Sequence, residues 1–389
     1  MEIKISGDVK YVGVNDHEVD LFEGQYPVPN GMAYNSYVVI DDKVVVFDTV
    51  DARFGEKWLG NIRSVLAGRE PDYLVVQHME PDHSSCIALF AEAFPAAKIV
   101  SSAMAFGMMG AFFGTSWKDR QVVVKEGDVL STGKHELTFV AAPMVHWPEV
   151  IVTYDKASGI LFSADAFGKF GANDVEDPEG WDCEARRYYF GIVGKYGAQA
   201  LALLKKASAL DIKTICPLHG PVLGTAEEIA HVVSQYTTWA SYAVESEGVL
   251  IAYTSVYGHT KAAVEKLAEM LKARGCPKVV TADLARDEMF ETVEDAFRYG
   301  KIVLATTTYN TDIFPFMRTF ISHLVERGYK DRTIGIVENG SWAPSAARVI
   351  KGLFAESKGI QFAEPVVTIR SALNAASEAQ LSALADALS

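Results

Sequence analysis

The sequence predicts an α/β protein of two domains, the second of which is a doubly wound parallel sheet of five strands. The chain has 389 residues, more than one ordinary domain contains. Up to residue 245, short strands and helices are interleaved irregularly, whereas from Gly248 onward they alternate regularly, which is typical of a doubly wound sheet. A short polar link, Glu245-Ser246-Glu247-Gly248, separates the two patterns. We therefore place the domains at residues 1–246 and 247–389.

The elements of the first domain follow from the spacing of its apolar residues. Alternating polar and apolar residues predict a strand at the start of the chain, and residues 33–40 and 43–48 predict a hairpin across Asp41-Asp42. Further strands are expected at residues 72–76, 136–141, 150–154, 160–162 and 212–216. Helical periodicity predicts an amphipathic segment at 85–94 and a long helix at 226–244.

The second domain repeats a strand followed by a helix. Strands are expected at residues 249–254, 278–282, 302–305 and 333–337, with a weaker fifth near 362–368. The helices are expected to begin near Thr260, Val293, Phe316, Ala343 and Ser377. Crossover helices between parallel strands define the doubly wound class.

Composition excludes several classes of function. The formal charge of −14 argues against nucleic-acid binding and against attraction to anionic lipid. No apolar run approaches the ~20 residues of a membrane helix, and the N-terminus lacks the apolar core of a signal peptide, so we expect a cytoplasmic protein. The four scattered cysteines form no C-x-x-C pair, which excludes a rubredoxin or zinc ribbon and a disulfide framework.

The strongest chemical signal is a run of six residues, His78-Met79-Glu80-Pro81-Asp82-His83, directly after the apolar segment YLVVQ. It offers four potential metal ligands where a strand ends and a loop can turn them inward. The alternative is a solvated loop that happens to be rich in carboxylates.

Three further candidates, His146, Asp165 and His219, have the same position relative to predicted strands. Each lies in a loop beside a strand end, where α/β folds build sites. Taken singly, each has a structural alternative, since His146 suits a sheet edge, Asp165 a helix N-cap and His219 a turn.

The order of these seven residues resembles the metallo-β-lactamase superfamily pattern, H-x-[HE]-x-D-H followed by His, Asp and His. The resemblance covers residues 1–245 and implies an αββα sandwich. Zinc hydrolases of that superfamily usually have histidine where this chain has Glu80. Four imidazoles and three carboxylates make a harder site, which favours iron over zinc.

In the second domain, Thr254-Ser255-Val256-Tyr257-Gly258-His259-Thr260 predicts a phosphate-binding loop at a helix N-terminus. The alternative is an ordinary helix capped by Thr260. Two loops after later strands offer polar groups and aromatic faces for a flavin ring, and the G-x-G-x-x-G fingerprint of dinucleotides is absent, so FMN is favoured. The predicted contacts are Thr254, Ser255, Val256, Tyr257, Gly258, His259, Thr260, Thr307, Thr308, Tyr309, Asn310, Thr311, Asn339, Gly340, Ser341 and Trp342.

A metallo-β-lactamase-like domain with Glu80, followed by a flavodoxin-like domain, resembles the flavodiiron proteins, minimal two-domain class. Further matching segments are His146-Trp147-Pro148, 163–167 and 184–189. The third flavin loop departs from the family because it lacks a W-G-G-G run, and no histidine lies between His17 and His78.

The resemblance implies FMN and two iron ions per chain. His78, Glu80 and His146 would hold one iron, Asp82, His83 and His219 the other, and Asp165 would bridge them. It implies a catalytic di-iron site that reduces dioxygen to water or nitric oxide to nitrous oxide, with electrons relayed through FMN. The implied partners are rubredoxin or a reduced deazaflavin as electron donor, and a second copy in a head-to-tail homodimer or dimer of dimers.

Two alternatives from other classes remain open on the sequence. One is a zinc-dependent hydrolase whose flavodoxin-like domain binds partners, and the other is an electron carrier with a vestigial metal site. Reduction of dioxygen to water takes four electrons, which two ferrous ions and a fully reduced FMN together supply. A hydrolase has no use for a flavin.

Overall fold

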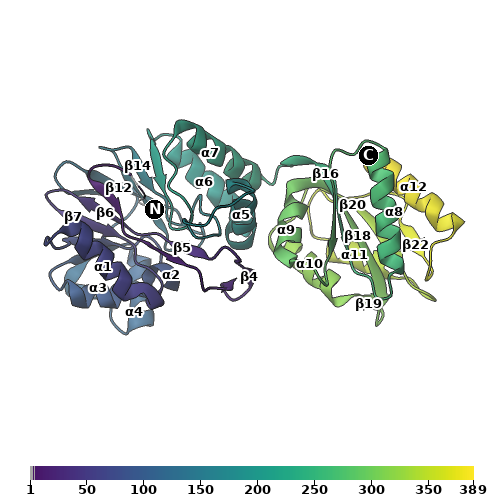
Figure 1. Cartoon of the computed structure of the whole chain (residues 1–389), viewed down its shortest axis with the longest axis horizontal. Helices are drawn as coiled ribbons and strands as arrows, with labels where there is room; N and C mark the ends of the chain where they lie inside the picture. Colours follow the sequence, from purple (N-terminus) through teal and green to yellow (C-terminus); the bar gives the residue numbers. More distant parts are fainter. Residues whose placement is uncertain (1–2, 4) are drawn as a thin grey trace. The chain divides into compact units, whose positions relative to one another are not determined.

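The computed structural model describes residue 3 and residues 5–389, and the chain forms two compact units, Met1–Ala240 and Ser241–Ser389 (Figure 1). The first strand of the second unit, β16, spans Ser246–Tyr253. The domain boundary predicted between residues 246 and 247 therefore falls directly after the first residue of this strand. The boundary itself stays a prediction. No helix among the described residues combines the length and hydropathy that crossing a bilayer requires.

Two facing sheets form the first unit. One has the order β1-β6-β7-β8-β9-β10 and the other the order β11-β12-β13-β14-β15. Their bounds are β1 Val9–Tyr11, β6 Tyr37–Ile40, β7 Val44–Phe47, β8 Tyr73–Val75, β9 Lys98–Ser101, β10 Gln121–Val123, β11 Val129–Ser131, β12 Glu136–Ala141, β13 Ile151–Asp155, β14 Ile160–Phe162 and β15 Thr214–Cys216. Two ribbons complete the unit, β2 (Val14–Asp16) with β5 (Met32–Tyr34) and β3 (Leu21–Phe22) with β4 (Tyr26–Pro27).

The core of this unit lies between the two sheets. Buried side chains from both sheets form one cluster, and the rings of Phe47 and Phe162 stack at 4.0 Å between centroids. All four residues of β7 are buried valine or phenylalanine, because apolar β-branched and aromatic side chains suit a strand covered on both faces.

Helices cover the outer face of each sheet, so the unit is an αββα sandwich (Figure 1). Their bounds are α1 Gly55–Leu66, α2 Pro81–Ser84, α3 Ile87–Ala93, α4 Ala103–Phe113, α5 Trp181–Tyr188, α6 Gly197–Ala207 and α7 Ala226–Ser241. Helix α1 buries Trp58, Leu59 and Ile62 at helical spacing and leaves its charged residues in solvent. This architecture confirms the predicted sandwich.

The second unit is a doubly wound sheet with the order β17-β16-β18-β20-β21, all parallel along this path. This is the 2-1-3-4-5 order of flavodoxin-like folds. The remaining bounds are β17 Val279–Asp283, β18 Tyr299–Tyr309, β19 Asp312–Ile313, β20 Thr333–Asn339, β21 Gln361–Phe362 and β22 Val367–Ile369. The fifth strand is split, because β21 and β22 both pair with β20. The predicted doubly wound sheet is confirmed.

Five helices flank this sheet, α8 His259–Ala273, α9 Met289–Arg298, α10 Pro315–Glu326, α11 Ala346–Leu353 and α12 Ala375–Leu388. Helices α8 and α12 share one core cluster with the sheet, and α9 and α10 lie on its other side (Figure 1). Strands β16, β18 and β20 therefore bring their carboxyl ends to one edge, where the order of strands reverses.

Candidate metal centre and cofactor cavity

The structure brings all seven predicted metal ligands together in the first unit. They lie in loops or short helices that follow buried strands, and their donor atoms form two adjacent groups. The first group is His78, Glu80, His146 and Asp165, and the second is Asp82, His83 and His219. In each group the donor atoms lie within 4.8 Å of one another. Their role as ligands remains a prediction that this convergence supports.

In the first group, two imidazoles face two carboxylates. His146 Nε2 lies 3.0 Å from Glu80 Oε2 and 3.1 Å from Asp165 Oδ2. His78 Nε2 lies 3.3 Å from the same Glu80 oxygen and 3.5 Å from the same Asp165 oxygen. Four donor atoms from four separate positions of the chain therefore surround one point.

The second group has the same character. His83 Nε2 and His219 Nε2 are 2.9 Å apart, and they lie 3.3 and 3.2 Å from Asp82 Oδ2. Asp165 reaches this group with its other oxygen, because Asp165 Oδ1 is 3.4 Å from His83 Nε2. One carboxylate thus presents one oxygen to each group, which is the arrangement of a bridging ligand.

These separations fit metal ions. Donors bound ~2.1 Å from one ion lie ~3.0 to ~3.4 Å apart along an octahedral or tetrahedral edge. Neither buried oxygen of Asp82 makes a hydrogen bond with the residues that the structure describes, although a buried polar atom normally has a partner. A cation at the second group would give these oxygens a partner.

The charges of the site are strongly coupled. Burial disfavours the charged form of Asp165, but the positive charge of His78 and the bond from His146 hold its pKa well below the usual range. Burial also opposes protonation of His146, but the carboxylates of Asp165 and Glu80 outweigh that effect and raise its pKa to about 9. Without a metal, the proton held by His146 thus offsets the charge of the carboxylates beside it, and a bound cation would take over that role.

The backbone around Asp165 is constrained. Ala164 and Phe167 have φ of +50° and +66°, in the left-handed region that is costly for residues with a side chain. Ser163 Oγ donates to the Ala166 carbonyl, and the Phe167 amide donates to Tyr236 Oη at 2.7 Å. These bonds hold the loop so that the Asp165 carboxylate lies between the two groups.

Three aromatic rings surround His219, with centroids at 5.4 Å for Phe22, 5.5 Å for Tyr188 and 6.1 Å for Tyr34. On the solvent side, a hollow of about 240 Å³ is lined by Glu80, Asp82 and the turn between β3 and β4. The carboxylates of Glu80 and Asp82 are therefore open to small solutes from this side.

Glu23, at the tip of that turn, also lines the hollow and was not predicted from the sequence. Burial and then the negative charge of Glu80 raise the pKa of Glu23 to about 7. It occupies part of the stretch between His17 and His78 in which no histidine occurs. The sequence indicates a turn at Glu23-Gly24. It does not indicate that this turn lies beside Glu80, because that contact arises only in the folded chain.

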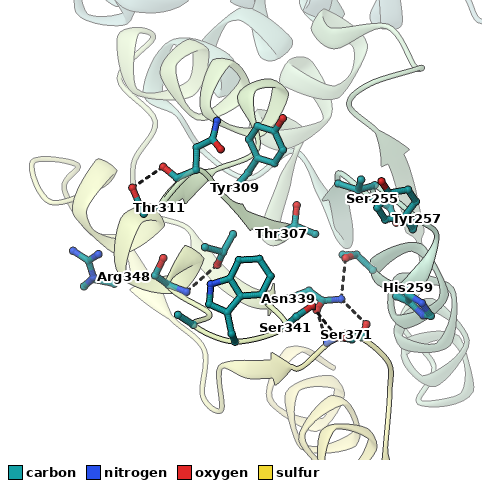
Figure 2. A pocket seen from close by; sticks show the side chains of 18 residues that line it. Ser255, Tyr257, His259, Thr307, Tyr309, Thr311, Asn339, Ser341, Arg348 and Ser371 are labelled. Atoms are coloured by element: carbon teal, nitrogen blue, oxygen red, sulfur yellow. Dashed lines mark hydrogen bonds between the residues drawn. The ribbon is translucent and has the colours of Figure 1, made fainter.

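In the second unit, a cavity of about 720 Å³ opens at the carboxyl ends of β16, β18 and β20 (Figure 2). That volume is typical of a site for a drug-sized ligand. Fourteen of the sixteen predicted flavin contacts line it, and Thr254 and Gly258 do not. Four further residues line the cavity and were not predicted, Ala343, Ser345, Arg348 and Ser371.

The two predicted contacts outside the lining support the loop instead. The Thr254 hydroxyl is buried and bonds to the Thr306 hydroxyl at 2.7 Å. Gly258 has φ +89° and begins helix α8, a conformation that glycine adopts without strain. Ser255 Oγ accepts bonds from the amides of Gly258 and Lys261, which closes the turn. The first amides of α8 therefore lie beside the cavity, as an anion site requires.

Two large aromatic side chains line the cavity almost without cover. Tyr257 is 90% exposed and Trp342 is 89% exposed, and they come from the loops after β16 and β20. Asn339 fixes the floor, since its side chain exchanges hydrogen bonds with the backbone of Ser371. Exposed aromatic faces beside polar groups suit a planar, polar ring system.

The fold and the two sites together define a class of two-unit protein. It carries paired groups of potential metal ligands on a metallo-β-lactamase-like sandwich and an open cavity on a flavodoxin-like sheet. Comparison with known proteins agrees, because residues 32–220 match the ODP family beta lactamase model. The chain is 31% identical over 360 residues to an uncharacterised protein of Methanocaldococcus jannaschii, which covers 91% of this chain and 89% of the relative.

Named relatives are oxidoreductases. Nitric oxide reductase of Moorella thermoacetica is 27% identical over 95% of this chain and 93% of its own length. The structure of rubredoxin oxygen:oxidoreductase from Desulfovibrio gigas matches with a TM-score of 0.92 and 26% identity, over 100% of this chain and 98% of that one. The chain belongs to the flavodiiron proteins, and it is an oxidoreductase.

Proposed function

We propose that this protein reduces dioxygen to water, nitric oxide to nitrous oxide, or both, at a non-haem di-iron site that receives electrons through FMN. The observation that carries the proposal is the division of seven ligands into two groups that share Asp165. Iron rather than zinc is supported by the donor set, in which Glu80 replaces one imidazole by a hard oxygen.

The first iron would be held by His78, Glu80 and His146, the second by Asp82, His83 and His219, with Asp165 bridging. When bound, the irons and FMN supply the electron transfer to the gas. Asp165 would hold both ions, because its two oxygens belong to different groups. The hollow beside Glu80 and Asp82 admits a small solute to both positions.

The cavity in the second unit would hold FMN. The loop that Ser255 closes and the first turn of α8 would bind the phosphate, and Tyr257 and Trp342 would cover the faces of the flavin ring. A rubredoxin or a reduced deazaflavin as donor, a head-to-tail homodimer or dimer of dimers, and a cytoplasmic location complete the proposal. The names of two relatives support the donor and the substrates, since one is called a rubredoxin-oxygen oxidoreductase and the other a nitric oxide reductase.

The test of function is anaerobic reduction of the holoenzyme followed by rapid mixing with each gas. We expect fast reoxidation with dioxygen and no release of peroxide or superoxide, or formation of nitrous oxide from nitric oxide. A carrier with a vestigial metal site would reoxidise slowly and release peroxide, which would contradict the proposal. A hydrolase would be recognised by zinc without flavin.

Replacing Trp342 with alanine should weaken FMN binding by roughly 10-fold, because stacking of an aromatic side chain on a planar ring contributes about 1–3 kcal/mol. Fluorescence titration of the flavin-free protein with FMN measures the affinity. Phe316→Ala is the matched control, since Phe316 is also an exposed aromatic residue of this unit but does not line the cavity. Equal affinity in the Trp342 variant and the control would remove Trp342 from the flavin site.

A further inference from the structure

We propose that Glu149 is a positioning residue that makes the two metal positions unequal. Its buried carboxylate bonds to His78 and lowers the reduction potential of the metal held by His78, Glu80 and His146 relative to the other metal. This inference rests on the proposed di-iron function and deepens it, because it assigns the order in which the two irons are oxidised.

Glu149 lies behind His78, on the side away from the other ligands. One of its oxygens, Oε1, is 2.9 Å from His78 Nδ1 and accepts a bond from the Met79 amide at 2.9 Å. Its side chain is fully buried, and its backbone carbonyl accepts a bond from Ser102 Oγ at 3.0 Å. The carboxylate is thus fixed by its own backbone and by the segment that carries the ligand.

The contact sets the tautomer of His78. Glu149 Oε1 is an acceptor, because it already receives the Met79 amide, so His78 Nδ1 must carry the hydrogen. With a metal bound, His78 Nε2 would then present its lone pair to the ion, on the side of Glu80 and Asp165. A carboxylate on the far nitrogen also makes the imidazole a stronger donor to the metal.

The second group has no equivalent. His219 Nδ1 bonds to the neutral backbone carbonyl of Ala33 at 2.7 Å, and His83 Nδ1 has no hydrogen-bond partner within the described part of the chain. Asp48 is also a buried carboxylate close to His83, but it accepts bonds from Gln77 and from the His78 amide rather than from an imidazole.

The energetic consequence follows from charge. The second oxygen of Glu149 is buried without a hydrogen-bond partner among residue 3 and residues 5–389, so the bonds that the first oxygen accepts from His78 and Met79 offset its negative charge only in part. In a weakly polar interior such a charge stabilises the more positive, oxidised metal, and the effect decreases with distance. The metal bound by His78 is nearer, and it is therefore expected to be oxidised first.

The experiment is a redox titration of the iron-loaded holoenzyme, followed by the electron paramagnetic resonance signal of the half-oxidised pair. The wild type should show two resolved one-electron steps. In Glu149→Gln the amide oxygen still accepts the Met79 bond but the charge is lost. The reduction potential of the first oxidation step should rise by ~59 mV, which is a tenfold change in the oxidised-to-reduced ratio for one electron. The iron content should stay at the wild-type value.

Asp155→Asn is the matched control. Asp155 Oδ2 lies 2.7 Å from His135 Nδ1, so it forms a buried carboxylate–imidazole pair in the same unit, but His135 is not among the metal groups. This variant should leave both steps unchanged. The inference is overturned if the potential of the first step is unchanged in Glu149→Gln, or if it shifts equally in Asp155→Asn. A single unresolved step in the wild type also overturns it, without any variant. A wild-type protein that binds no iron would instead overturn the proposed function.

Discussion

Replacing Asp165 with asparagine should lower gas reduction by more than ~100-fold and reduce the iron content of the protein. The loss should exceed the 10- to 100-fold cost of removing an outer partner of a metal ligand, because Asp165 serves both metal groups. Asparagine offers one oxygen, and its amide nitrogen has no lone pair for a metal. Iron analysis and rapid mixing with dioxygen or nitric oxide measure the two effects.

Asp174→Asn serves as control for this substitution. Asp174 is a largely exposed residue of the same unit that pairs with His17, so its variant should keep both iron and activity. If Asp165→Asn retained two irons and the wild-type rate, the shared carboxylate would have no part in the site.

Replacing Arg332 with methionine should lower the free energy of unfolding of the second unit by about 3 kcal/mol or more. Arg332 is a buried cation whose guanidinium donates to the backbone carbonyls of Tyr242, Ala243, Phe297 and Tyr299. Burial lowers its pKa. Methionine fills the space but donates no hydrogen bond, and a hydrogen bond from a charged group contributes about 1.5–3 kcal/mol.

Denaturant unfolding followed by flavin fluorescence measures this change. Arg318→Met is the control, because Arg318 is a half-exposed residue whose pair with Asp312 contributes little. It should stay within about 0.5 kcal/mol of the wild type. A variant of Arg332 as stable as that control would show that the carbonyls find other partners.

The strands were predicted best where apolar residues form short uninterrupted runs. The hairpin over residues 37–47 pairs Tyr37 with Phe47 and Ile40 with Val44, as the turn at Asp41-Asp42 predicts. The predicted strand began four residues too early, because Met32–Tyr34 pairs with β2 in a separate ribbon. Such pairing depends on contacts between distant segments, which periodicity does not report.

Some element ends also depended on side-chain bonds. Helix α9 begins at Met289 rather than near Val293, because the Glu288 side chain accepts a bond from the Glu291 amide and caps it. Strand β18 extends to Tyr309, beyond its apolar run, where β19 pairs with its last residues. The apolar run thus indicates only the centre of this strand, and polar residues continue it.

The metal site was predictable because its seven candidate ligands, all histidines or carboxylates, follow one another along the chain in a known order. Glu149 was not, although it lies only three residues after His146, because its partner His78 lies on another strand end. Arg348 and Ser371 line the cavity of the second unit from segments with no phosphate-loop pattern. Residues of this kind act through tertiary contacts alone.

If the proposed function is correct, this chain holds two irons and one FMN. The most direct measurement is the metal and flavin content of protein purified without oxygen after growth with ample iron. The proposal predicts two irons per chain, one FMN released by denaturation, and zinc at trace level. Zinc in the place of iron, or protein that is free of metal although folded and yellow, would contradict it.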